Sequence, residues 1–160
     1  MALRLPEEAG LAQAHARMER ALEVARQTPS GDVPVGAVVF DPQGREIATG
    51  VNRREERGDP TAHAEMEAIR SAVRVFGDGW RLAGCEIVVT LEPCAMCAGA
   101  IQSARLDSVV FGAFEPKTGA CGSLVDVLRA PGAGFIPHVR GGVCAEATSR
   151  QLVDFFHALR

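Results

Sequence analysis

The sequence predicts an α/β sandwich, in which a mixed central sheet is covered by helices. Segments with the apolar character of strands alternate with segments of helical periodicity, which is the pattern of α/β proteins. The first two predicted strands are joined by the short turn Asp41–Gly44, so they form an antiparallel hairpin and the sheet is mixed. The 160 residues are 47% hydrophobic and contain no linker or repeat, which indicates a single domain over residues 1–160.

The N-terminal half is expected to contain a helix, the hairpin and a second helix. Its expected elements are residues 11–27 (helix), 35–40 and 46–51 (hairpin strands), 52–59 (polar, arginine-rich loop) and 60–76 (helix). Asp59 followed by Pro60 has the pattern of an N-cap and a first helical residue, so the second helix is expected to begin there. Gly77-Asp78-Gly79 would end it.

The C-terminal half is expected to contain two strands, two helices and a long irregular region. Its expected elements are residues 85–91 (strand), 93–104 (helix), 108–113 (strand), 115–123 (loop) and 132–142 (irregular, with a short strand near His138). Leu152, Val153, Phe156 and Leu159 would give a terminal helix its apolar face.

Two short motifs carry the candidate chemistry, His63-Ala64-Glu65 and Pro93-Cys94-Ala95-Met96-Cys97. One histidine and two cysteines can supply three zinc ligands, and three protein ligands leave the fourth tetrahedral position for water, as in catalytic sites. Both motifs lie at predicted helix N-termini, where unpaired N–H groups favour the thiolate that zinc needs. The sequence therefore predicts a catalytic zinc site with His63, Cys94 and Cys97 as ligands.

Glu65 is expected to move protons rather than bind metal. Residues two apart point to nearly opposite sides of a regular helix, so His63 and Glu65 can share a site only at a helix entry. Zinc lowers the pKa of bound water to about 7, and Glu65 can carry a proton from that water to a substrate nitrogen. The order H-x-E…P-C-x-x-C resembles the signature of zinc deaminases, which remove an amino group from a base by hydrolysis.

A redox-active cysteine pair and a structural zinc site are the alternative interpretations of these motifs. A structural site normally has a fourth Cys or His, but His15, His138 and His157 have no metal-ligand spacing. The remaining cysteines, Cys85, Cys121 and Cys144, lie in no paired motif. The catalytic interpretation is therefore favoured.

Composition and charge narrow the class of protein further. A net charge of −3 argues against a nonspecific nucleic-acid binder, which would be basic. The basic residues are almost all arginine, and Lys117 is the single lysine. The first eight residues lack the apolar stretch of a signal peptide, no apolar run approaches the length of a membrane span, and five cysteines without framework spacing fit a reducing compartment. A cytoplasmic protein without membrane contact is expected.

Longer stretches of the chain resemble the bacterial tRNA-specific adenosine deaminases, a branch of the cytidine and deoxycytidylate deaminase superfamily. The matching stretches are residues 33–38, 52–53, 59–65, 89–100, 110–113, 117–124 and 154–156. The zinc motif is common to cytidine, cytosine and guanine deaminases, whereas the 117–124 segment and Asp154-Phe155-Phe156 favour the tRNA enzymes. The resemblance implies a cytidine-deaminase-like three-layer α/β/α sandwich, a Zn²⁺ cofactor, a homodimer, and conversion of the wobble adenosine of a tRNA anticodon to inosine.

The resemblance also implies roles for residues around the zinc site. Asn52 would contact the target nucleoside, and Pro34 and Val35 would line the base pocket. Lys117 would lie in the loop that meets the tRNA anticodon stem-loop, and Phe156 on the helix that closes over it. The alternatives are a turn residue at Asn52 and core packing at Phe156.

Two other functions are compatible with the same motifs. A deaminase of a free base or nucleoside, such as cytosine, guanine or cytidine, would use the same chemistry without a basic surface; the arginines at 53, 54 and 57 favour RNA instead. A catalytically inactive subunit that only binds RNA would be expected to lack the proton carrier, but Glu65 is present. Glu92 is expected to cap a helix or support the site rather than act as a second base.

Overall fold

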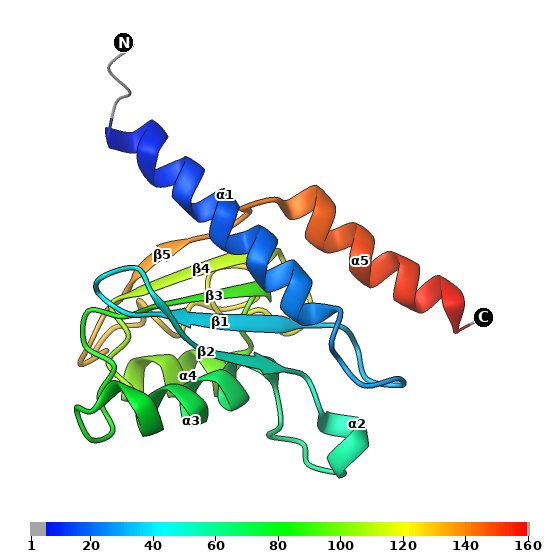
Figure 1. Ribbon diagram of the computed structural model, residues 1–160, viewed down its shortest axis with the longest axis horizontal. Coiled ribbons are helices and arrows are strands. Elements are labelled where there is room, and N and C mark those ends of the chain that lie inside the picture. Colours follow the sequence, from blue (N-terminus) through cyan, green and yellow to red (C-terminus); the bar gives the residue numbers. More distant parts are fainter. Residues whose placement is uncertain (1–5, 160) are drawn as a thin grey trace.

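The computed structural model describes residues 6–159 and has the predicted three-layer α/β/α architecture. Its strands are β1 (Gly36–Phe40), β2 (Glu46–Val51), β3 (Glu86–Leu91), β4 (Ser108–Ala113) and β5 (His138–Arg140). Figure 1 shows α1 (Pro6–Ala25) and α5 (Ala145–Ala158) on one face of the sheet, and α3 (Ala64–Phe76) and α4 (Ala95–Ser103) on the other. The short helix α2 (Arg54–Arg57) lies outside these layers, beyond the end of β2 (Figure 1).

The strand directions bring four loops to one edge of the sheet. The strand order is β2-β1-β3-β4-β5, with β1 antiparallel to β2 and β3, and with β3, β4 and β5 parallel. The strands β2, β3 and β4 therefore end at the edge where β1 begins. In the register, Gly36 lies opposite Val51, and Leu91 lies opposite Ala113. The segments after β2, β3 and β4, and the segment before β1, are consequently neighbours.

The central strands are mainly apolar because both faces of the sheet are covered. All five residues of β1 are buried. Val38 and Val88 belong to a cluster that contains Met18 of α1, whereas Val39 and Val89 belong to the cluster on the opposite face of the sheet. This two-sided burial explains why these strands are continuous apolar runs rather than alternating ones.

Gly50 of β2 allows the first turn of α3 to lie directly on the sheet. A Cβ atom at this position would overlap the carbonyl oxygen of Ala64 and the backbone nitrogen of Ala68. Because His63 is the N-cap of α3, this close approach fixes where the imidazole stands relative to the sheet edge.

The predicted start of α3 was wrong. Its N-cap is His63 rather than Asp59, and the helix begins at Ala64. The Asp59 carboxylate instead accepts hydrogen bonds from the backbone N–H and the hydroxyl of Thr61, each at 2.8 Å, in the local turn that Asp side chains favour. The shift places His63 and Glu65 at the helix entry, where their side chains can share one site.

Two smaller differences concern neighbouring segments. The helix predicted from Pro93 begins at Ala95, with Cys94 as its N-cap. The segment 52–59, predicted as a loop, contains the four-residue α2, which is too short to produce a periodic pattern.

Between residues 6 and 159, no helix is both long and apolar enough to cross a bilayer. Residues 1–5, on which the signal-peptide expectation partly rests, lie outside the described part of the chain.

Candidate zinc centre and active site

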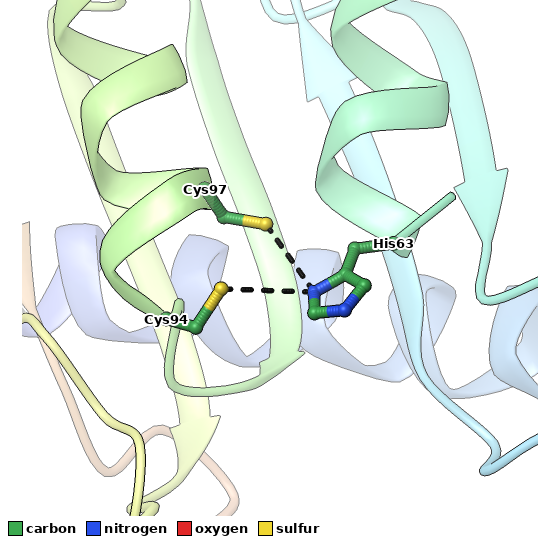
Figure 2. A group of neighbouring side chains, drawn as sticks. All are labelled: His63, Cys94 and Cys97. Carbon is green, nitrogen blue, oxygen red and sulfur yellow. Dashed lines mark hydrogen bonds between the residues drawn. The ribbon is translucent and has the colours of Figure 1, made fainter. Parts of the chain in front are cut away.

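His63, Cys94 and Cys97 meet where α3 and α4 begin. His63 and Cys94 are the N-cap residues of the two helices, and Cys97 lies in the first turn of α4. The Nδ1 atom of His63 lies 3.7 Å from the Sγ atom of Cys94 and 3.6 Å from that of Cys97, and Figure 2 shows the imidazole facing both sulfurs. The potential ligand atoms of the three residues all lie within 4.8 Å of one another.

This geometry fits zinc. Bond lengths of about 2.3 Å to sulfur and about 2.0–2.1 Å to nitrogen, at tetrahedral angles, place the nitrogen and each sulfur about 3.6 Å apart. The observed separations of 3.6 and 3.7 Å match that value. One imidazole and two sulfur donors are also the ligand types that zinc prefers, and a set of three is typical of catalytic rather than structural sites.

The pKa values of the Cys94 and Cys97 thiols are shifted in opposite directions. Hydrogen bonds from Cys97 and His63 outweigh burial and lower the pKa of the Cys94 thiol to about 4. The hydrogen bond to Cys94, together with burial, raises the pKa of the Cys97 thiol. The pair by itself therefore favours one thiolate and one thiol, and a bound divalent cation is what allows both sulfurs to ionise.

Glu65 is a buried carboxyl group beside this cluster. Glu65 belongs to the first turn of α3 and is only 4% exposed. It lines the same cavity as His63 and Cys94. Burial raises the pKa of the Glu65 carboxyl to about 7. A group with a pKa near neutrality can both accept and donate protons, as a general acid–base requires.

His63, Cys94 and Glu65 line a cavity of about 540 Å³, within the range of about 300–1,000 Å³ that is usual for small-ligand sites. The lining comes from the sheet-edge segments and from α5, namely residues within 31–35, 52–55, 63–65, 91–94, 115–118 and 152–159. Elements far apart in the sequence thus share one concave site.

The structure brings three of the five predicted substrate-contacting residues to the cavity. Val35, Asn52 and Phe156 line it, whereas Pro34 and Lys117 do not. Pro34 is partly buried next to Val35, and Lys117 is exposed in the 115–123 loop. Phe156 is 50% exposed, so core packing does not explain this side chain.

Further apolar residues of α5 form one wall of the cavity. The residues that line it are Leu152, Phe155, Phe156 and Leu159. The apolar face expected from the sequence included Val153 and omitted Phe155; Val153 is exposed and Phe155 lines the cavity. The spacing i, i+3, i+4, i+7 is the signal that identifies the correct face.

The arginine-rich segment is less basic than its sequence indicates. Arg53 pairs with Glu56 at 2.6 Å, and Arg54 pairs with Glu55 at 3.0 Å. Arg57 pairs with Glu67 of α3 at 2.8 Å. These ion pairs weaken the argument that the three arginines form a surface for RNA.

Glu92 lines the cavity and anchors the 115–123 loop. Its buried carboxylate accepts hydrogen bonds from the backbone N–H groups of Glu115, Cys121 and Ser123, each at 3.0 Å, and from the Ser123 hydroxyl. Burial alone would raise the pKa of this carboxyl, but these hydrogen bonds lower it below its ordinary value. A Cβ atom at Gly119 would overlap the carboxylate, so glycine permits this approach. Glu92 thus supports the site, as expected, although Cys94 caps the helix.

Comparison with known proteins identifies the class. Residues 11–113 match the family described as the cytidine and deoxycytidylate deaminase zinc-binding region. The tRNA-specific adenosine deaminase of Bacillus subtilis is 42% identical over 144 residues, which cover 89% of this chain and 88% of the relative. A solved structure from a study of A-to-I editing by tRNA:A34 deaminases is 42% identical, with a TM-score of 0.78, covering 84% of this chain and 97% of that one.

The chain belongs to the cytidine and deoxycytidylate deaminase family, and this assignment confirms the predicted fold and zinc cofactor. Within that family it belongs to the tRNA-specific adenosine deaminases. It is also 46% identical over 144 residues to a Deinococcus deserti protein named tRNA(Ile)-lysidine synthase, which it matches over 89% of its own length. The chain spans about a quarter of the length of that protein, 27% of it.

Replacing Cys97 by alanine is expected to weaken zinc binding more than about 100-fold. Loss of a residue that only hydrogen-bonds a metal ligand already lowers metal affinity about 10–100-fold, and Cys97 is itself a proposed ligand. Zinc content after dialysis against a weak chelator measures the effect. Cys85→Ala, which removes another fully buried cysteine, is the matched control and should keep its zinc. Stoichiometric zinc in Cys97→Ala would contradict the assignment.

Glu92→Gln is expected to lower the free energy of unfolding by about 1–3 kcal/mol. The glutamine N–H₂ group would face buried N–H groups that now donate hydrogen bonds to the carboxylate, so at least one of these bonds would be lost. Urea denaturation of the zinc-loaded protein measures the change. Glu115→Gln serves as the control, since that carboxylate accepts one backbone hydrogen bond, from Lys117, in an exposed part of the same loop. Equal stabilities of the two variants would show that Glu92 does not anchor the loop.

Proposed function

We propose that this chain catalyses the hydrolytic deamination of adenosine to inosine at the wobble position of a tRNA anticodon. The observation that carries the proposal is the cluster of His63, Cys94 and Cys97 beside the buried Glu65, with His63, Cys94 and Glu65 lining one cavity. The relatives that match over most of their length are named tRNA-specific adenosine deaminases, and the two Deinococcus relatives carry the name tRNA(Ile)-lysidine synthase. These names support tRNA as the substrate class.

In this proposal His63, Cys94 and Cys97 would hold the zinc ion, which when bound would supply an activated water. Glu65 would carry one proton from the attacking water to the ring nitrogen of adenine. It would then carry a second proton from the hydroxyl group added to the ring to the departing amino group, so that adenosine and water give inosine and ammonia. Its burial keeps bulk water from competing for the proton. The other residues of the cavity bind and orient the base.

Asn52 is suited to the nucleoside contact. Its Nδ2 atom donates to the carbonyl of Val33 at 3.0 Å, and its Oδ1 atom accepts from the N–H of Arg54 at 3.2 Å. One N–H and one lone pair of the amide remain for a substrate. Val35 lines the cavity and would contact the base, whereas the neighbouring Pro34 is partly buried and does not line the cavity.

The aromatic wall of α5 favours RNA over a free base. A nucleotide flipped out of an anticodon loop has neighbours that need stacking partners, and half-exposed aromatic side chains provide them. Phe156 is half exposed at the cavity mouth, and Lys117 lies in the adjoining loop as a candidate phosphate contact. A deaminase of free cytosine, guanine or cytidine is the alternative, since the zinc chemistry is common to both.

A homodimer in the cytoplasm completes the proposal. The helix α4 carries no charged residue, and its positions Ala95, Met96 and Gly99 are exposed or only partly buried in the single chain. A helix that is apolar or small on all sides is normally covered. A second copy packed on this face would cover it beside the zinc ligands.

Glu65→Ala is expected to abolish deamination while zinc and fold remain, because Glu65 carries protons and does not bind the metal. The assay incubates zinc-loaded protein with an anticodon stem-loop that has adenosine at the wobble position and detects inosine as guanosine in the cDNA. Glu23→Ala, at an exposed glutamate of α1 that does not line the cavity, is the control. Activity near wild type, or loss of zinc, would show that Glu65 has another role. Wild-type turnover of free cytosine or guanine without turnover of the stem-loop would replace the tRNA proposal by the alternative.

Sedimentation equilibrium at micromolar concentration is expected to give a mass of about 34 kDa, twice the 16.9 kDa of one chain. Gly99→Arg, on the outward face of α4, should shift the protein toward the monomer. A wild-type mass equal to one chain would refute the dimer without bearing on the zinc site.

A further inference from the structure

We propose that Asp32 is a positioning residue, whose buried carboxylate holds the cavity wall that contains Asn52. Asp32 does not line the cavity itself. The inference rests on the proposed function in so far as Asn52 contacts the substrate nucleoside. Asp32 belongs to neither of the two sequence motifs that carry the candidate chemistry.

The carboxylate of Asp32 joins two segments that are distant in the sequence. Its Oδ1 atom accepts the backbone N–H of Glu55 at 2.7 Å, and its Oδ2 atom accepts that of Glu56 at 3.0 Å. Asp32 is only 2% exposed. Hydrogen bonds from N–H groups to an ionised carboxylate are roughly twice as strong as neutral ones, so the two bonds form a firm clamp.

Few other contacts hold α2 to the rest of the described chain, among them the ion pair of Arg57 with Glu67 of α3 at 2.8 Å. The helix α2 spans four residues, none of them buried, and its N-cap Arg53 makes no side-chain capping hydrogen bond. Helices this short are not stable on their own. The ion pairs Arg53–Glu56 and Arg54–Glu55 lie within the segment and are exposed, so they contribute little and do not tie it to the rest of the molecule.

The position of α2 determines the orientation of the Asn52 amide. Arg54, the first residue of α2, donates its N–H to Oδ1 of Asn52. On the other side, Asn52 is bonded to the segment before β1, through its backbone N–H to the carbonyl of Val35 at 3.1 Å and through its side chain to Val33. Displacement of α2 would remove one of the two bonds that orient the amide.

The same clamp shapes the cavity rim. Arg54 and Glu55 line the cavity from one side of the clamp, and Gly31 and Val33 line it from the other. Asp32 thus binds together the two segments that form this wall. Its effect should be on substrate positioning, because neither segment contains a proposed zinc ligand or Glu65.

Asp41 provides a matched control. It is also buried, at 5% exposed, and its Oδ1 atom accepts two backbone N–H groups, from Gln43 and Arg45, each at 2.9 Å. These bonds lie within the β1–β2 turn, at the end of β1 opposite to the cavity. Asp41→Asn therefore removes a comparable buried cap without touching the cavity wall.

The test compares Asp32→Asn with Asp41→Asn in the zinc-loaded, full-length protein. We expect kcat/KM on the anticodon stem-loop to fall between about 10- and 100-fold in Asp32→Asn, the cost of a misplaced binding group, and to stay within twofold in Asp41→Asn. Zinc content should be unchanged in both variants. Amide hydrogen exchange at Glu55 and Glu56 should accelerate only in Asp32→Asn.

A double-mutant cycle shows whether Asp32 acts through Asn52. If it does, Asp32→Asn should cost little additional kcat/KM in a protein that already carries Asn52→Ala, since the two effects are not additive. Fully additive losses, or equal kcat/KM for Asp32→Asn and Asp41→Asn, would overturn the inference. If the wild-type protein makes no inosine, the proposed function fails; unchanged exchange at Glu55 and Glu56 in Asp32→Asn would separately refute the clamp.

Discussion

The site depends on one geometric constraint, namely that α3 and α4 must begin at the same point on the sheet edge. Only then do an N-cap histidine and an N-cap cysteine lie 3.7 Å apart, with Cys97 one turn further along. The common direction of β2 and β3 brings the two helix starts to one edge, and Gly50 brings α3 close to the sheet. Helix N-termini favour the thiolate, so the backbone also prepares the chemistry of the ligands.

Two buried carboxylates, neither of them a proposed reactant, hold two loop segments of the cavity wall in place. On one side, Glu92 accepts hydrogen bonds from backbone N–H groups of the 115–123 loop. On the other side, Asp32 accepts hydrogen bonds from backbone N–H groups of α2. Loops that bind substrate have few apolar contacts of their own, so a buried acceptor with several donors is an efficient way to order them. In this arrangement the sheet determines where the metal ligands lie, and Glu92 and Asp32 determine where two walls of the cavity lie.

Much of the fold and the centre of the site could be predicted because both follow local patterns. The hairpin, the apolar strands and the H-x-E and C-x-x-C motifs are short-range signals, and the structure places all of them as expected. The start of α3 was misplaced because Asp59 can cap a turn as well as a helix. The clamp at Asp32 could not be found from local patterns, because its partners are 23 and 24 residues away. The ion pair of Arg57 with Glu67 is equally invisible without the tertiary structure.

X-ray absorption at the zinc edge tests the central claim most directly, because it counts the ligands of the metal in the loaded protein. A three-ligand catalytic centre formed by His63, Cys94 and Cys97 predicts two sulfur atoms at about 2.3 Å and two nitrogen or oxygen atoms at about 2.0–2.1 Å, one of them from solvent. A shell of three or four sulfur atoms would mean that another cysteine completes a closed structural site. That result would contradict the account.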